Sequence, residues 1–101
     1  MDQKNNDLDR VLKRLKLSPE GRYKDGFYII DLKDSNEYSK VYTLLDDNAI
    51  NTEYPNFGTN TNNSTVKITN YFEITEGDST FNIFLIADFL KGTYYVKFGE
   101  A

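Results

Sequence analysis

The stretch VKITNYFEITEGDSTFNIFLIADFLKGTYYVKF, residues 66–98, decides the fold of this chain. Its first part alternates apolar and polar side chains, with Ile68, Phe72 and Ile74 on one side, which is typical of a strand with one face in water. Turns at 76–79 and 88–92 divide the rest, and the middle piece, 81–87, is apolar on both faces, as in a central strand. We predict an antiparallel β-meander.

One clear helix precedes this meander. Leu8, Val11, Leu12 and Leu15 recur at the helical spacing i, i+3, i+4, i+7 within residues 7–17. The turn-forming segment 18–21 contains proline and glycine and is expected to end the helix. We expect residues 1–6 to be a flexible tail and residues 7–101 to form a single α+β domain, because the length suits one core.

Between helix and meander the pattern is less uniform. Residues 22–32 read as one strand, with a bulge or bend at Asp25-Gly26. Residues 34–47 favour a helix, because Asp34 and Glu37 have the spacing of a capping box, but a hairpin there stays open. The segment 48–64 is polar; a short strand near residues 49–53 is possible, and the rest is expected to be a long loop. The predicted fold is α+β: an antiparallel sheet of four to five strands with one or two helices packed on one face.

The chain contains neither histidine nor cysteine. It therefore lacks the usual general base near neutral pH, thiolate nucleophiles and the ligands of most transition-metal sites. The carboxylates show no calcium-loop spacing, and the six glycines form no phosphate-binding loop. We expect no enzyme activity, no metal site and no cofactor.

Charge is unevenly distributed along the chain. Residues 1–24 carry seven basic and four acidic side chains, a net of +3, whereas residues 25–101 carry five lysines and twelve carboxylates, a net of −7. Arg10, Lys13 and Arg14 share one side of the predicted helix and could contact phosphates, so nucleic-acid binding is an alternative. The polar start has no secretory pattern and no apolar run is long enough to cross a bilayer, so we expect a cytoplasmic protein that does not enter a membrane.

A protein partner is the interpretation that remains after these exclusions. Tyrosines on the wet faces of strands, apolar residues in the long loop and carboxylates on the predicted sheet are the candidate contacts. The candidate partner-binding residues are Tyr54, Phe57, Tyr71, Glu73, Glu76, Asp78, Asp88 and Tyr95.

In composition the chain is similar to small accessory proteins of phages and mobile elements in AT-rich bacteria. The resemblance rests on richness in Lys, Asn, Asp, Thr and Tyr, a compact size and an acidic balance, and on no motif. That class includes inhibitors of host defence nucleases as well as minor virion and regulatory proteins. Together with the residues, it favours an inhibitor of a host nucleic-acid-handling (defence) protein, and charge complementarity suggests that an acidic sheet face would compete with a phosphate backbone. The alternatives are a small assembly protein that forms homo-oligomers and a nucleic-acid-binding regulator that uses the N-terminal helix.

Overall fold

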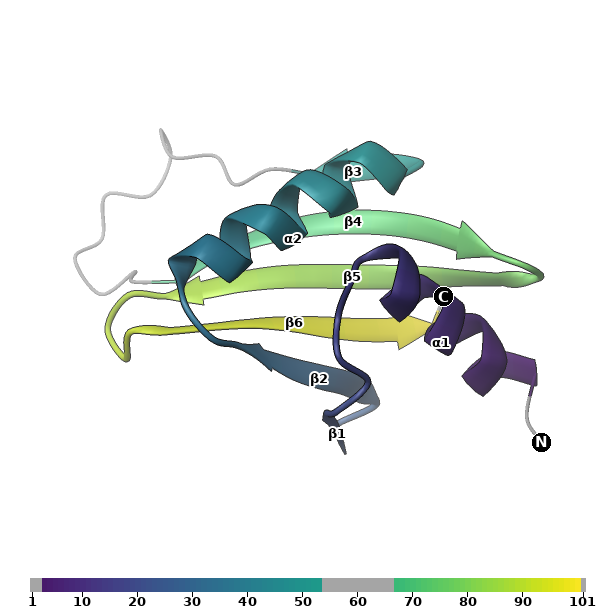
Figure 1. The fold of residues 1–101 in the computed structure, drawn as a ribbon, viewed down its shortest axis with the longest axis horizontal. Helices are drawn as coiled ribbons and strands as arrows, with labels where there is room; N and C mark the ends of the chain where they lie inside the picture. The colour runs from purple at the N-terminus through teal and green to yellow at the C-terminus, as the bar shows by residue number, and fades with distance from the viewer. Residues whose placement is uncertain (1–2, 54–66, 101) are drawn as a thin grey trace.

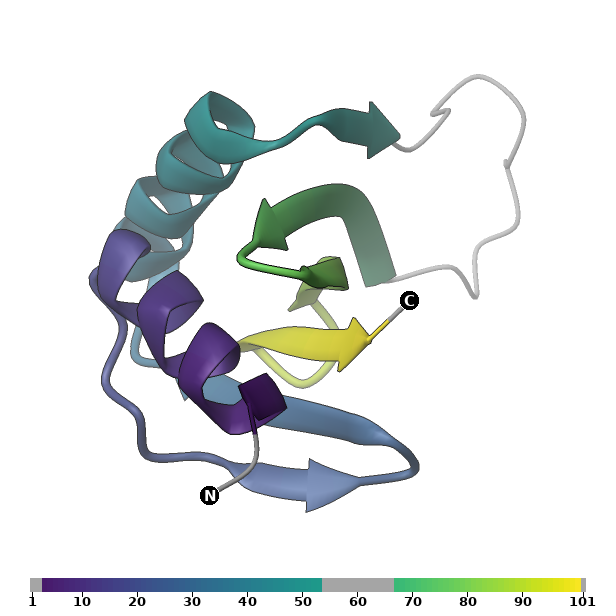
Figure 2. The same ribbon diagram turned by 90° about the vertical axis from the view of Figure 1, so that its right-hand side faces the viewer.

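A computed structural model describes residues 3–53 and 67–100 and shows an α+β fold (Figure 1). Its elements are α1 (Gln3–Arg14), β1 (Arg22–Lys24), β2 (Phe27–Leu32), α2 (Ser35–Asn48), β3 (Asn51–Glu53), β4 (Lys67–Glu76), β5 (Ser79–Asp88) and β6 (Thr93–Glu100). The strands form one antiparallel sheet in the order β1-β2-β6-β5-β4-β3. Both helices lie against the same face of this sheet (Figure 2). The predicted class is confirmed, but the sheet has six strands instead of four to five.

The additional strand comes from the segment 22–32, which is a hairpin and not a single strand. Lys24 pairs with Phe27 across a two-residue turn at Asp25-Gly26. Both turn residues have positive φ, 53° at Asp25 and 86° at Gly26, as the tight hairpin turn with the right twist requires. The bend expected at Asp25-Gly26 is therefore a complete chain reversal.

Helix α1 begins earlier than expected. It starts at Gln3, so residues 3–6, which we assigned to a flexible tail, are helical. Asn5 and Asn6, a residue type that often caps the start of a helix, do not interrupt it. The predicted apolar stripe of Leu8, Val11 and Leu12 is buried against the sheet.

Helix α1 also ends earlier than expected, in a Schellman motif. The Leu17 N–H donates to the Leu12 carbonyl at 2.9 Å, and the Lys16 N–H donates to the Lys13 carbonyl at 3.1 Å. Lys16 makes this possible by adopting a left-handed conformation with φ of 56°. The chain thus leaves the helix before the proline and glycine that we expected to end it.

We expect Lys16→Gly to raise the free energy of unfolding by roughly 0.5–1 kcal/mol, because glycine adopts the left-handed conformation without the steric cost that a side chain meets. Urea unfolding followed by circular dichroism measures the change. The matched control is Lys13→Gly in the last turn of α1, which is expected to lower stability by about 1 kcal/mol. A loss of stability in both variants would contradict the assigned helix end.

The segment 34–47, for which the sequence favoured a helix but left a hairpin open, forms helix α2. Asp34 caps it, and its carboxylate accepts the Glu37 N–H at 2.9 Å. The Glu37 carboxylate reaches back to the Lys33 N–H at 2.8 Å, so both members of the predicted capping pair bind backbone amides. Val41 and Leu45 are the buried residues of this helix.

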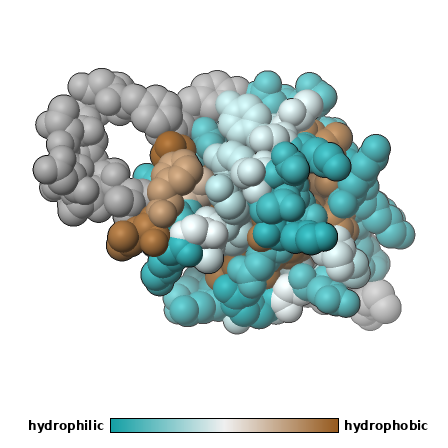
Figure 3. Space-filling view, turned by 60° about the vertical axis from the view of Figure 1, so that its left-hand side comes forward, coloured by the Kyte–Doolittle hydropathy of each residue, from teal (hydrophilic) through white to brown (hydrophobic). Residues whose placement is uncertain are grey.

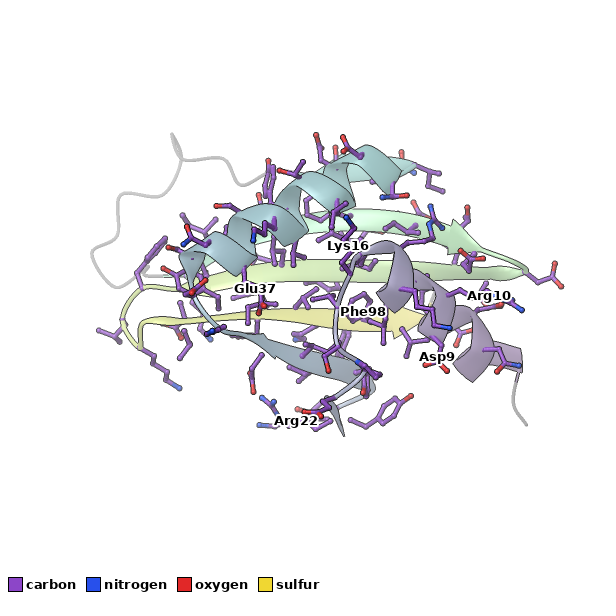
Figure 4. All side chains as sticks on the ribbon, viewed as in Figure 1. Asp9, Arg10, Lys16, Arg22, Glu37 and Phe98 are labelled. Carbon is purple, nitrogen blue, oxygen red and sulfur yellow. The ribbon has the colours of Figure 1, made fainter. Side chains whose placement is uncertain are left out.

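The core lies between the two helices and the inner face of the sheet. The α1 stripe and the buried residues of α2 pack on alternate residues of the four inner strands, which are Ile30, Leu32, Phe72, Ile74, Phe81, Ile83, Leu85, Val96 and Phe98. Phe98 on β6, labelled in Figure 4, belongs to this buried cluster. A polar contact crosses the interface where the Asn70 amide donates to the Tyr38 hydroxyl at 3.0 Å. In the part of the chain that the structure describes, no helix is long and apolar enough to span a bilayer.

Candidate functional site

The sheet face opposite the helices carries the candidate site. Neither α1 nor α2 covers this open face (Figure 2). Strand pairing aligns one residue from each strand in a row across it: Arg22, Ile29, Lys97, Phe84, Tyr71 and Glu53. The row changes from basic through aromatic to acidic, so the open face is polarised across its width.

Three rings form an aromatic centre on the open face: Phe27, Phe84 and Tyr71. The Phe84 ring lies 5.9 Å from the Phe27 ring, edge to face, and 5.3 Å from the Tyr71 ring. Phe27 packs directly over Gly99, where an added Cβ would lie 2.7 Å from the ring, so the glycine makes room for it. The Lys97 ammonium lies 4.4 Å from the centroid of the Phe27 ring. All three rings are only half-buried and remain available for contact.

Tyr71 is held in place at the boundary of the aromatic centre and an acidic flank, which we define as Glu53 and Glu73. Its hydroxyl donates to the Asn82 side-chain oxygen at 2.6 Å. Burial raises the pKa of Tyr71, and the Glu73 and Glu53 carboxylates raise it further. The hydroxyl therefore stays protonated near neutral pH. Glu73 accepts a hydrogen bond from the Asn51 amide at 2.7 Å.

On the other side of the aromatic centre the open face is hollowed. The hollow measures about 420 Å³. We call it the basic hollow, because five cationic and three anionic side chains line it. Its lining residues are Arg22, Lys24, Asp25, Ile29, Asp31, Lys67, Asp88, Lys91, Thr93, Tyr95 and Lys97.

Ion pairs neutralise only part of this charge. Arg22 pairs with Asp31 at 2.8 Å, and Lys67 lies 3.9 Å from the buried Asp88, whose exposure is 4%. Within residues 3–53 and 67–100, three lysines of the hollow make no ion pair; they are Lys24, Lys91 and Lys97. The basic hollow therefore carries a net positive charge in a protein whose overall charge is −4.

The predicted tyrosines both lie on the open face. Tyr71 belongs to the aromatic centre, and Tyr95 lines the basic hollow beside Asp31, its cross-strand neighbour. Both are half-buried. Tyr54 and Phe57, the other predicted apolar contacts, lie outside the described residues.

The predicted acidic residues do not form one acidic face. Glu73 is on the open face, but the Glu76 carboxylate accepts the Arg14 guanidinium at 2.8 Å, on the helix side. Asp78 lies in the β4–β5 turn, and Asp88 is buried at the opposite end of β5. A ten-residue strand spans about 30 Å, so these two aspartates are far apart. The expectation of an acidic sheet face is wrong in this geometry.

The basic side of α1 is largely engaged within the protein. Arg10 pairs with Asp7 at 3.1 Å. Arg14 binds Glu76 and also donates to the Asn48 side chain at 2.8 Å and to the Thr75 carbonyl at 3.1 Å. Of the three predicted phosphate contacts, only Lys13 makes no ion pair within the described residues. In Figure 4, Arg10 on α1 lies well apart from Arg22 at the β1 edge of the sheet.

Of the residues that line the basic hollow, the sequence predicts only Tyr95 and Asp88 as site residues, and it predicts none of the five cations. Lys67 and Lys97 each stand between two apolar residues in the sequence, as outward-facing strand residues do, but their segments are separated by the whole of β5. Once the strand register is known, the alternation of side chains along each strand places both lysines on the same face of the sheet as Arg22 and Lys24.

The arrangement is suited to binding. It offers cations, aromatic faces and hydroxyl groups. Among the described residues, no three His, Cys, Asp or Glu side chains are grouped so that they could hold a metal ion. No family model, curated protein or solved structure matches the chain.

A small apolar projection lies at the turn between β5 and β6. Phe89 and Leu90 are 57% and 77% exposed there. Figure 3 brings this end of the molecule forward and shows a small hydrophobic patch on an otherwise mostly hydrophilic surface. Lys91 follows directly, so the turn borders the basic hollow.

Proposed function

We propose that this protein is a non-enzymatic binding domain that contacts a protein partner through the open face of its sheet. The observation that carries the proposal is the half-buried aromatic centre between a basic hollow and an acidic flank. Interfaces between proteins concentrate aromatic residues at their centre and polar residues at their rim, and complementary charge fixes the orientation of the partner.

Such a binding domain could inhibit a host nucleic-acid-handling protein, but the contact surface differs from the acidic sheet face that we expected from the sequence. An inhibitor that imitates a phosphate backbone needs one continuous acidic surface, and the four carboxylates considered for it lie on different sides of the molecule. We therefore propose that any such inhibitor contacts its target through the mixed charge of the open face.

Affinity capture with matched variants tests the proposal. The open-face variant is Tyr71→Ala/Glu73→Lys, and the control is Ser39→Ala/Lys40→Glu on exposed positions of α2. From the lysate of an AT-rich bacterium, treated with nuclease, we expect wild type and control to retain the same protein at a fixed stoichiometry. The open-face variant is expected to retain it on the order of tenfold less well.

Circular dichroism before capture establishes that both variants are folded. Equal retention by the open-face variant, or loss of the partner only in the α2 control, would contradict the proposed contact surface.

A second candidate is self-association through the same face, and the polarity of the face favours it. A two-fold axis along β5 would set the β6 side of one copy opposite the β4 side of the other, and Lys97 and Glu73 lie on these two strands. Molar mass measured over a range of protein concentrations distinguishes the candidates. If copies pair in this way, Lys97→Glu should weaken the dimer and Lys97→Glu/Glu73→Lys should restore it, whereas a monomer at all concentrations excludes this function.

A further inference from the structure

We infer that the basic hollow is a binding site for a compact phosphate-bearing ligand with at least two negative charges, such as a diphosphate. This inference does not rest on a protein partner, because the ligand needs only side chains of this chain. It concerns the basic side of the open face and not the aromatic centre.

The first argument is convergence. The five cations come from four separate segments: Arg22 and Lys24 from β1, Lys67 from the start of β4, Lys91 from the β5–β6 turn and Lys97 from β6. Like charges that are brought together repel one another, so their gathering disfavours the fold unless counter-charge is present. The aspartates of the hollow supply part of that counter-charge, and an anionic ligand would supply the rest.

The second argument is the distribution of the remaining charge. Asp31 already accepts Arg22, and the Asp88 carboxylate accepts the Lys91 backbone N–H at 3.1 Å while it lies near Lys67. These two carboxylates are held by protein groups. Within the described residues, the ammonium groups of Lys24, Lys91 and Lys97 have no carboxylate partner, although that of Lys97 also lies 4.4 Å from the centroid of the Phe27 ring. Asp25 is the remaining carboxylate of the lining.

The third argument is chemistry and size. Lysine ammonium groups are compact charges that bind phosphate oxygens without demanding a planar partner, and the hydroxyls of Thr93 and Tyr95 add donors. A hollow of about 420 Å³ falls within the range of small-molecule sites. Ile29 and the Tyr95 ring provide an apolar wall for a part of the ligand that carries no charge.

A long polyanion fits this face less well than a compact ligand. The same row of residues that begins at Arg22 ends at Glu53, so a chain of phosphates crossing the sheet would meet the acidic flank. The Phe27 and Phe84 rings also pack against each other, which leaves less of their faces for stacking with bases.

Isothermal titration calorimetry of the full chain with sodium pyrophosphate tests the inference, at low ionic strength and in a buffer free of phosphate. We expect saturable binding of one pyrophosphate per chain. Lys91→Gln and Lys97→Gln should each weaken it on the order of tenfold, because each removes a charge-assisted hydrogen bond. The matched control, Lys40→Gln on exposed α2, should bind as wild type does.

Lys91 lies in an exposed turn, so Lys91→Gln tests the site without disturbing the contact of Lys97 with Phe27. A parallel titration with ADP shows whether the apolar wall contributes, since tighter binding of ADP than of pyrophosphate would place the nucleoside there.

Three results would overturn the inference. The first is no saturable binding of pyrophosphate at millimolar concentration. The second is an equal loss in Lys40→Gln, which would indicate general attraction of counter-ions. The third is a single-stranded oligonucleotide that binds far more tightly than pyrophosphate and is lost in Lys91→Gln, which would assign the hollow to a polymer. The titration contains no protein partner, so a failure to bind pyrophosphate does not contradict the proposed function. Likewise, a failure of affinity capture to retain a protein does not contradict pyrophosphate binding.

Discussion

Phe72→Ala is expected to lower the free energy of unfolding by about 3–5 kcal/mol, enough to threaten a domain of this size. The Phe72 side chain is 0% exposed at the middle of β4 and packs edge to face on Tyr42 of α2 at 5.7 Å. Its removal takes apolar surface out of the contact between helix and sheet and leaves a cavity that rigid strands fill only in part.

Urea unfolding followed by far-ultraviolet circular dichroism measures this loss. The matched control is Phe89→Ala, which removes the same side chain from the exposed β5–β6 turn and should change stability by less than about 0.5 kcal/mol. If the two alanine variants lose similar stability, the assignment of the inner face of β4 to the core is wrong.

Asp7→Ala should lower the free energy of unfolding by about 2–4 kcal/mol, although Asp7 is a charged residue in a polar stretch of sequence. Asp7 is 0% exposed, and its carboxylate accepts the buried Ser79 hydroxyl at 2.7 Å as well as the Arg10 guanidinium. It also lies against Gly77, where an added Cβ would approach its oxygen to 2.8 Å. The residue therefore ties α1 to the β4–β5 turn, and its loss leaves the Ser79 hydroxyl buried without this acceptor.

A double-mutant cycle with Ser79→Ala measures the contact itself. We expect the two substitutions together to cost less than the sum of the single losses, because either one alone breaks the same hydrogen bond. The control is Asp9→Ala, at an exposed position of the same helix. Strict additivity, or an equal loss in Asp9→Ala, would show that Asp7 does not carry this link.

Local patterns predicted most of the fold. The alternation in 66–98 gave the meander, and the cap at Asp34 correctly outweighed the strand preference of Tyr38 and Val41. The hairpin at Asp25-Gly26 was not predicted, because the apolar run that follows favours one continuous strand, although this dipeptide is a strong turn signal. The left-handed Lys16 could not be read from sequence, because glycine is the usual residue there.

The site was less predictable, for two different reasons. The acidic face could have been rejected from the sequence, since Glu73 and Glu76 are an odd number of residues apart and so lie on opposite faces of one strand. The basic hollow could not have been found in this way. It depends on which strands are neighbours and in what register, and that information is carried by packing across the whole sheet.

The central claim is that the open face of the sheet is the surface that binds a partner, and lysine acetylation of the captured complex tests it without any substitution. Four lysines lie on the open face or at its rim, Lys24, Lys67, Lys91 and Lys97, and four exposed lysines lie elsewhere, Lys13, Lys16, Lys33 and Lys40. Mass spectrometry of the free and the bound protein compares their reactivity. We predict protection of the first set and unchanged labelling of the second, whereas protection confined to the second set would contradict the account.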